Sequence, residues 1–300
     1  MIWHEMGEVV PGFHVLGSWH TPSYLWAGPR PVLFDAGMSF LGDLYVEHTR
    51  RVLGGRLPEI LFLTHVHFDH CGAASTLQNA FPGLRIAASA RSAEIVQRPG
   101  ALELMRRLNE EARILAPSIE VDRPAAAGFR PFAVDTILAD GDEIELGDGQ
   151  IVRVLATPGH TRDFLSYYLP GPKVLVASEA VGCATISGEI MVEFVADYDA
   201  YVDSMRRLRD LDVEVLCQGH LYVHVGQDAQ NYLDRSIRAT VRYREWVEEL
   251  LDEERGDVDR VVTRVKAAEW DPAIEPKQPA PAYLLNTEAR VRHLAGRSRT

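Results

Sequence analysis

The sequence is poor in cysteine, in positive charge and in long hydrophobic runs, and each shortage excludes a class of protein. Its three cysteines, Cys71, Cys183 and Cys217, form no CxxC pair, which argues against a disulfide framework and favours a reducing cytoplasm. The net charge of −12 argues against a nucleic-acid partner, since a phosphate backbone requires a basic surface. No stretch approaches the roughly 18 apolar residues of a membrane span, and no signal peptide is evident. We therefore expect a cytoplasmic protein with no nucleic-acid or membrane partner.

What the sequence does contain is a short segment dense in metal-binding side chains. Residues 64–70 read Thr-His-Val-His-Phe-Asp-His and follow an apolar stretch. If residues 60–64 form a buried strand, His65 and His67 point to the same side, because side chains two apart share a face. Asp69 and His70 then belong to the turn that opens the next helix, at residues 73–79. Three imidazoles and a carboxylate at one strand end suit Zn²⁺, or iron or manganese where carboxylates contribute.

Three further strand ends supply candidate ligands. Residues 151–156 read as a buried strand that runs into Thr-Pro-Gly-His-Thr, where Pro158 and Gly159 favour a tight turn that presents His160. Residues 173–177 read as a strand followed by Glu179, and residues 214–217 as a strand followed by Gln-Gly-His with His220. Because one short turn rarely completes a metal site, we expect these side chains to join the first cluster.

The order HxHxDH, TPGHT, an acidic residue after a strand and then GH resembles the metallo-β-lactamase fold superfamily over roughly residues 8–225. The turn after residues 32–34, which begins at Asp35, is also similar to that family. The resemblance implies two divalent metal ions as cofactors, zinc first, with iron or manganese as alternatives. It implies the following ligands: His65, His67 and His160 for one ion, Asp69, His70 and His220 for the other, and an acidic bridge between the two ions.

The bridging position departs from the family pattern. The family usually has Asp there, whereas this chain has Glu179, and no Asp lies between Asp163 and Asp197. The longer side chain requires the strand end to retract or the metal spacing to change. Three outcomes stay open: a Glu179 bridge between two ions, Glu179 on one ion only, or a single ion with weak activity.

The resemblance also implies an α/β fold, namely an αββα four-layer sandwich whose two sheets pack together with helices outside. Apolar residues at helical spacing in residues 101–116 predict an inserted helix, within an insert at about residues 99–118. We expect a metal hydrolase domain over residues 1–225 and a C-terminal helical extension over residues 226–300. In the extension, the pattern predicts a long helix at 227–251, a second helix capped by Asp257, a proline-rich extended linker at 271–282 and a short helix at 283–295.

The insert and the extension have two interpretations. Their apolar faces could simply pack onto the core, or they could cover the metal cleft and select an apolar substrate. An insert combined with a helical tail resembles the PqsE-type thioesterases of the superfamily. The apolar faces of the tail are also compatible with a homodimer.

The resemblance implies a hydrolase that uses a metal-bridged hydroxide, which Asp69 would orient while it binds metal. Arg162, Asp163 and Asp35 are candidates for contacts with the substrate or with the metal ligands. The sequence offers no separate general acid, so a good leaving group is favoured, and a thiolate leaves readily because the thiol pKa is about 8.5. We therefore expect a small acyl or apolar substrate with a thioester or lactone bond.

Three rival functions are compatible with the sequence. One is a non-catalytic or weakly active metal-binding regulatory protein, which the substitution at Glu179 makes conceivable. Another is a phosphodiesterase of the same fold, although basic residues do not cluster near the motifs. The third is an oxygen-reducing di-iron protein, whose HxExDH pattern differs from the His67-Phe68-Asp69 of this chain.

Overall fold

The computed structural model describes residues 1–114, 128–274 and 277–297. Most of the described strands lie in two seven-stranded sheets. The first sheet has the order β2(Gly7–Val10), β3(Phe13–Ser18), β4(Thr21–Trp26), β5(Val32–Phe34), β6(Ile60–Phe62), β7(Arg85–Ser89) and β8(Thr136–Leu138). The second has the order β1(Ile2–Trp3), β16(Val223–Val225), β15(Val215–Cys217), β12(Val174–Val176), β11(Leu165–Leu169), β10(Gln150–Ala156) and β9(Glu143–Gly147). A small hairpin, β13(Cys183–Ala184) and β14(Ile190–Met191), stands apart.

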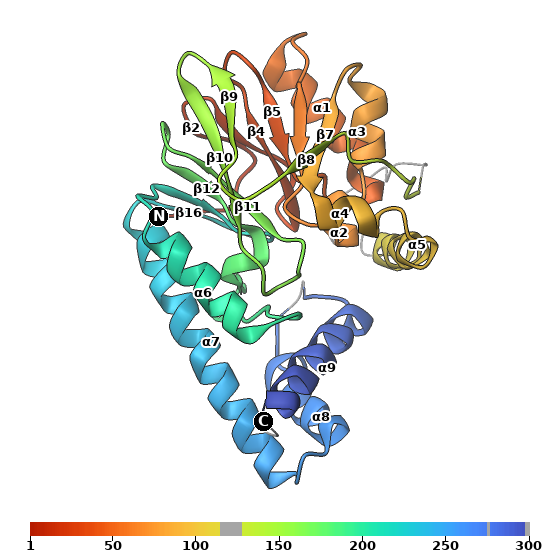
Figure 1. Ribbon diagram of the computed structural model, residues 1–300, viewed down its shortest axis with the longest axis vertical. Helices are drawn as coiled ribbons and strands as arrows, with labels where there is room; N and C mark the ends of the chain where they lie inside the picture. Colours follow the sequence, from red (N-terminus) through yellow and green to blue (C-terminus); the bar gives the residue numbers. More distant parts are fainter. Residues whose placement is uncertain (115–127, 275–276, 298–300) are drawn as a thin grey trace.

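Helices surround the two sheets, some on their outer faces and others across one end of the sandwich (Figure 1). They are α1(Gly42–Leu53), α2(Phe68–Cys71), α3(Ala74–Ala80), α4(Ala90–Ile95), α5(Pro99–Arg113), α6(Tyr198–Arg209), α7(Gln227–Glu253), α8(Val258–Glu269) and α9(Ala280–Arg297). Two 3₁₀ turns, at Ser39–Leu41 and Ser178–Val181, complete the described helical elements. Apolar side chains at Tyr201, Met205 and Leu208 predict a helix over Tyr198–Arg209. Helix α6 has these bounds, and its apolar face packs on the second sheet.

The core between the sheets explains why the strands read as apolar runs. Phe34, Phe62 and Tyr167 meet there with ring centroids 5.1–5.6 Å apart, two from the first sheet and one from the second. Their strands are covered on both faces, so nearly every position is apolar rather than every other one. Together with the outer helices, this core confirms the predicted αββα sandwich.

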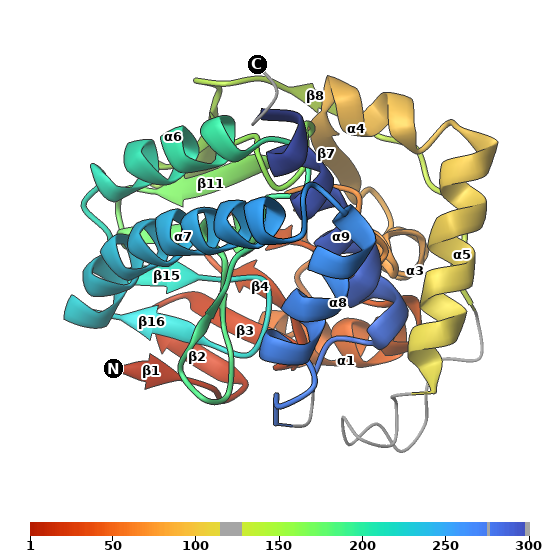
Figure 2. The ribbon, with the colours of Figure 1, turned by 90° about the horizontal axis from the view of Figure 1, so that it is seen from below.

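Helix α7 packs against the second sheet, and α8 and α9 pack on α7 and reach across one end of the sandwich. Viewed from below, α8 and α9 lie between α7 and the inserted helix α5 (Figure 2). The prediction of an extended linker at 271–282 is wrong for its last residues, because α9 begins at Ala280. Pro281 fits because the first turn of a helix leaves its backbone N–H groups unpaired and needs no donor from proline. The predicted helix at 283–295 is therefore part of a longer one.

Two predictions fall partly outside the described residues: the inserted helix, and the linker at 271–282, of which residues 275 and 276 are not described. The inserted helix ends at Arg113, and the last residues of the predicted helix and of the insert, 115–118, lie outside the described residues. The boundary between domain and extension at residue 225 stays a prediction, although α7 begins directly after it. Among the described helices, none has the length and apolar character needed to cross a membrane.

Candidate metal centre

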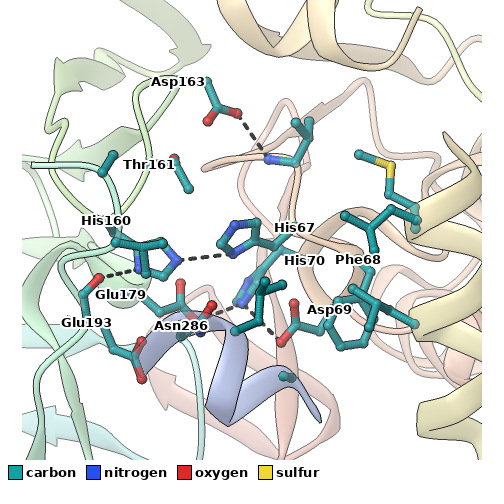
Figure 3. Close-up of a pocket in the computed structure, with 18 of the residues that line it drawn as sticks. His67, Phe68, Asp69, His70, His160, Thr161, Asp163, Glu179, Glu193 and Asn286 are labelled. Carbon is teal, nitrogen blue, oxygen red and sulfur yellow. Dashed lines mark hydrogen bonds and ion pairs between the residues drawn. The ribbon is translucent and has the colours of Figure 1, made fainter. Parts of the chain in front are cut away.

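The seven side chains that the sequence predicts as metal ligands lie together in the structure. Figure 3 labels His67, Asp69, His70, His160 and Glu179 among them. They come from five places: His65 and His67 after β6, Asp69 and His70 on α2, His160 after β10, Glu179 on the 3₁₀ turn after β12, and His220 after β15. Strands β5 and β6 are parallel, as are β12 and β15. Their carboxyl ends therefore meet at the same edge of the sandwich, and loops from both sheets contribute to one site.

The turn that carries His160 depends on glycine. Gly159 has a φ of +134°, in the region that favours glycine. A Cβ at this position would lie 2.3 Å from the Cα of Tyr201 on α6. The turn can therefore approach α6 closely, and His160 points back into the cluster.

The ligand atoms form two main groups. Those of His65, His67 and His160 lie within 4.8 Å of one another, and so do those of Asp69, His70 and His220. In the first group, His160 Nε2 is 3.1 Å from His67 Nδ1. In the second, Asp69 Oδ2 is 3.7 Å from His220 Nε2 and 3.9 Å from His70 Nε2. These are the two groups that the family resemblance implies.

The Glu179 carboxylate lies between the two groups. Its Oε1 is 2.7 Å from His70 Nε2 and 2.9 Å from His220 Nε2, while its Oε2 is 3.9 Å from His65 Nε2. The longer side chain fits because position 219 is glycine, where a Cβ would lie 2.0 Å from Glu179 Oε1. The carboxylate therefore faces histidines of both groups, and the three outcomes for Glu179 stay predictions.

Buried atoms without hydrogen bonds indicate that this cluster fits cations. His65 Nε2, His70 Nε2 and Glu179 Oε1 are buried and make no aligned hydrogen bond among the described residues. His70 Nε2 and Glu179 Oε1 form an ion pair with each other at 2.7 Å, whereas His65 Nε2 lies 3.9 Å from Glu179 Oε2. Because buried polar atoms are nearly always satisfied, His65 Nε2 calls for a further partner. A divalent cation bound by histidine and carboxylate has the required chemistry.

Burial also keeps ligand histidines in the neutral form that binds metal. It lowers the pKa of His65 well below the ordinary value and that of His160 to about 4. For Glu179, burial alone would raise the pKa, but the neighbouring His70 and His220 hold it well below the usual range. Burial alone would also lower the pKa of His70 and His220, but the Glu179 carboxylate raises both above the ordinary value. The cluster therefore offers neutral imidazoles at His65 and His160, and an ionised Glu179 carboxylate that pairs with His70 and His220.

Surrounding acceptors orient the ligand rings. His160 Nδ1 lies 2.5 Å from the Glu193 carbonyl, and His220 Nδ1 lies 2.5 Å from the His20 carbonyl. The Asp35 carboxylate lies 3.1 Å from His70 Nδ1 and also accepts hydrogen bonds from the backbone N–H and hydroxyl of Thr64. Such contacts fix the tautomer and direction of a metal-binding imidazole. Asp35, a predicted contact of the ligands, is therefore in position to act on His70.

Asp163 and Arg162, the other two predicted contact residues, differ in burial. Asp163 is buried, and its Oδ2 accepts hydrogen bonds from the Val66 N–H at 3.2 Å and the Ser92 hydroxyl at 2.8 Å. It therefore supports the turn between His65 and His67. Arg162 is exposed and lines the cleft, with no bond to a ligand.

A cleft of about 360 Å³ opens above the ligands. One wall comes from α5, with Leu104, Met105 and Leu108, and another from α9, with Ala282 and Leu285. Arg91 and Arg162 also line it. The inserted helix and the extension thus form an apolar part of the cleft, whereas charged groups lie elsewhere on its lining.

Glu193 is a residue of the cleft that the sequence did not reveal. It is 6% exposed, and burial raises the pKa of its carboxyl to about 7. It lies outside any motif, in a stretch between β14 and α6 with no apolar periodicity, and only the tertiary fold brings it beside His160. Within the sequence, only the acidic character of its side chain could have indicated a role in the site.

Comparison with known proteins gives the same family as the motifs. A sequence model of the Metallo-beta-lactamase superfamily matches residues 19–220. An acyl-coenzyme A thioesterase of Gallus gallus is 29% identical over 197 residues, which are 61% of this chain and 65% of that protein. A hydroxyacylglutathione hydrolase of Bradyrhizobium sp. (strain ORS 278) is 31% identical over 174 residues, 56% of this chain and 50% of that protein. The matches thus cover between half and two thirds of these relatives.

Solved structures share the whole architecture at low identity. A metallo-beta-lactamase superfamily protein from Sulfolobus tokodaii has a TM-score of 0.60 and 17% identity, covering 95% of this chain and 98% of that one. A family protein from Thermus thermophilus has a TM-score of 0.66 and 19% identity, covering 97% and 95%. These similarities concern the fold alone. The family model covers most of the chain and includes all seven clustered side chains, so this protein belongs to the metallo-beta-lactamase superfamily.

Proposed function

We propose that the protein is a metal-dependent hydrolase that cleaves a thioester with an apolar acyl group. The observation that carries this proposal is the position of the ligand cluster, which lines a cleft with apolar walls from α5 and α9. The two curated relatives described above are a thioesterase for acyl-coenzyme A and a hydrolase for hydroxyacylglutathione. Both names describe the hydrolysis of a thioester, and this shared bond guides the choice over a lactone.

The metal-binding roles follow from the two groups of ligand atoms. His65, His67 and His160 would hold one ion, Asp69, His70 and His220 would hold the other, and Glu179 would contact both. When bound, divalent ions of this kind supply a water that is deprotonated near neutral pH and polarise a carbonyl. Zinc suits the histidine-rich donor set best, with iron or manganese as alternatives.

The side chains of the protein would do the rest of the work. Asp69 is partly exposed to the cleft and lies at the edge of the second group, where its carboxylate can orient the attacking water. The apolar side chains of Leu104 and Leu285 would contact the acyl group and keep bulk water away from it. The guanidinium groups of Arg91 and Arg162 would attract the anionic part of a thiol carrier.

An assay of thiol release tests this proposal. Protein reconstituted with Zn²⁺, Mn²⁺ or Fe²⁺ is given acyl-coenzyme A and acylglutathione thioesters, lactones, and a phosphodiester. We expect hydrolysis of thioesters, with a loss of at least about 100-fold in His67→Ala that keeps its circular dichroism spectrum. Cleavage of the phosphodiester alone would favour a phosphodiesterase, and metal binding without turnover of any substrate would favour a regulatory protein.

A further inference from the structure

The C-terminal extension sends one arginine into the interior, toward the metal cluster. Arg290 on α9 is 1% exposed and is among the largest fully buried side chains. Its Nη1 donates a hydrogen bond to the Val192 carbonyl, and its Nη2 donates one to Thr287 Oγ1 at 2.8 Å. Its guanidinium also lies over the Tyr243 ring, 4.9 Å from the centroid. The side chain is therefore fixed in direction by α7, by α9 and by the segment at residue 192.

That segment is in direct contact with a metal ligand. Glu193, the next residue, accepts the hydrogen bond from His160 Nδ1 at 2.5 Å through its backbone carbonyl. Three residues later, the Ala196 N–H donates to the Gly159 carbonyl at 3.0 Å and to the His160 carbonyl at 3.1 Å. The segment 192–196 thus lies between Arg290 and the His160 turn and is bound to both.

The chemistry of these contacts indicates that Arg290 orients the backbone beside His160 and does more than fill space in the core. A buried guanidinium costs free energy that an apolar side chain of similar size would avoid. What an arginine adds is a planar set of donors that fixes a carbonyl in direction. The adjacent carbonyl is the one that holds His160 with its proton on Nδ1 and its Nε2 toward His67.

We propose that Arg290 is a positioning residue for the metal ligand His160, acting through the backbone at Val192 and Glu193. On this account, the extension, which lies beyond the residues matched by the family model, is part of the metal centre. The proposal concerns metal affinity, so its outcome is separate from that of the thioesterase proposal.

A double-mutant cycle on the full-length protein tests this assignment. Zinc affinity is measured by competition with chelators of graded strength for wild type, Arg290→Gln, His160→Ala and the double variant. We expect Arg290→Gln to weaken the affinity roughly 10-fold, the lower end of what loss of an orienting partner costs. In the His160→Ala background, we expect the same change to weaken it less than about 2-fold, because the ligand on which Arg290 acts is gone.

Matched variants separate this role from general destabilisation. Arg292→Gln changes the same residue type on the same helix, but Arg292 is exposed and pairs with Glu288, so zinc affinity should stay at the wild-type value. Should Arg290→Gln fail to fold, the cycle is run with Arg290→Lys, which keeps a buried cation but loses the planar donors. A folded variant with wild-type affinity, or an equal loss in both His160 backgrounds, would overturn the proposal.

Discussion

At the scale of single residues, Glu179 and Gly219 explain how this chain accommodates a glutamate where its family usually has aspartate. The Glu179 carboxylate reaches both ligand groups, and it occupies the space that a side chain at position 219 would need. The sequence indicated that the longer side chain of Glu179 requires extra space, but it did not indicate which residue leaves that space. Gly219 looked like an ordinary part of a Gly-His pair, and only the fold shows which side chain passes over it.

The first prediction is that Gly219→Ala disturbs metal binding. Its new Cβ would lie 2.0 Å from Glu179 Oε1, so the carboxylate must move away from His70 and His220. We expect metal content measured by elemental analysis to fall from about two equivalents per chain to about one or less. The control is Gly296→Ala, whose Cβ meets no atom within 4 Å.

A second-site change makes this test specific. Glu179→Asp shortens the carboxylate by one methylene, so Gly219→Ala combined with Glu179→Asp should bind more metal than Gly219→Ala alone. If Gly219→Ala bound as much metal as wild type, Glu179 would not hold the position that we assign to it.

At the scale of elements, the inserted helix α5 is held in place by the ligand turn itself. Asn109 on α5 is buried, its Oδ1 accepts a hydrogen bond from the Ser39 N–H at 2.8 Å, and its Nδ2 donates to the Phe68 carbonyl at 3.2 Å. The α5 wall of the cleft is thereby attached to α2, which carries Asp69 and His70. Helix α5 therefore packs onto the core and also lines the cleft, so the two interpretations of the insert do not exclude each other.

The second prediction concerns the wall formed by α9. Leu285 is 53% exposed and lines the cleft, whereas its neighbour Leu284 is 36% exposed and does not. We expect Leu285→Gln to raise KM for long-chain thioesters roughly 3- to 10-fold, because part of the apolar area available to the chain is lost. The KM for an acetyl thioester should change little.

Leu284→Gln is the matched control for this prediction, since it makes the same change one position away on the same helix. Equal KM values for Leu284→Gln and Leu285→Gln with a long-chain thioester would show that the α9 wall does not contact the acyl group.

The elements also show why sequence reasoning succeeded in some places and failed in others. The helix at Tyr198–Arg209 was predictable because its apolar face meets one sheet and gives a regular spacing. The start of α9 was not, because four prolines suggested an extended chain and the local sequence did not reveal where the helix begins. Glu193 was missed because its contact with His160 joins residues 33 positions apart.

At the scale of the whole molecule, the buried imidazole of His224 links the stability of the fold to pH. His224 is 2% exposed and stacks on Tyr232 at 4.1 Å between ring centroids, and its Nε2 lies 3.1 Å from Gln218 Oε1. Burial lowers its pKa to about 4, with help from the charge of Arg235, although Asp228 opposes the shift. The folded protein therefore binds a proton at His224 less readily than the unfolded chain.

The third prediction is a loss of stability on acidification. Because the folded pKa is lower than the unfolded value, the contribution of His224 is complete above pH 6.5 and declines as the pH falls toward 4. Over this window it amounts to roughly 3 kcal/mol. Urea unfolding at several pH values should show a shallower pH dependence in His224→Gln than in wild type, and identical slopes would contradict the assignment.

The proposed thioesterase activity depends on a pair of metal ions held by the seven clustered side chains. The most direct test is the rate of thiol release from a long-chain acyl-coenzyme A as Zn²⁺ is added stepwise to metal-free protein. We predict that the rate rises with bound metal and levels off near about two equivalents per chain. Metal bound to about that level with no release of thiol would contradict the claim.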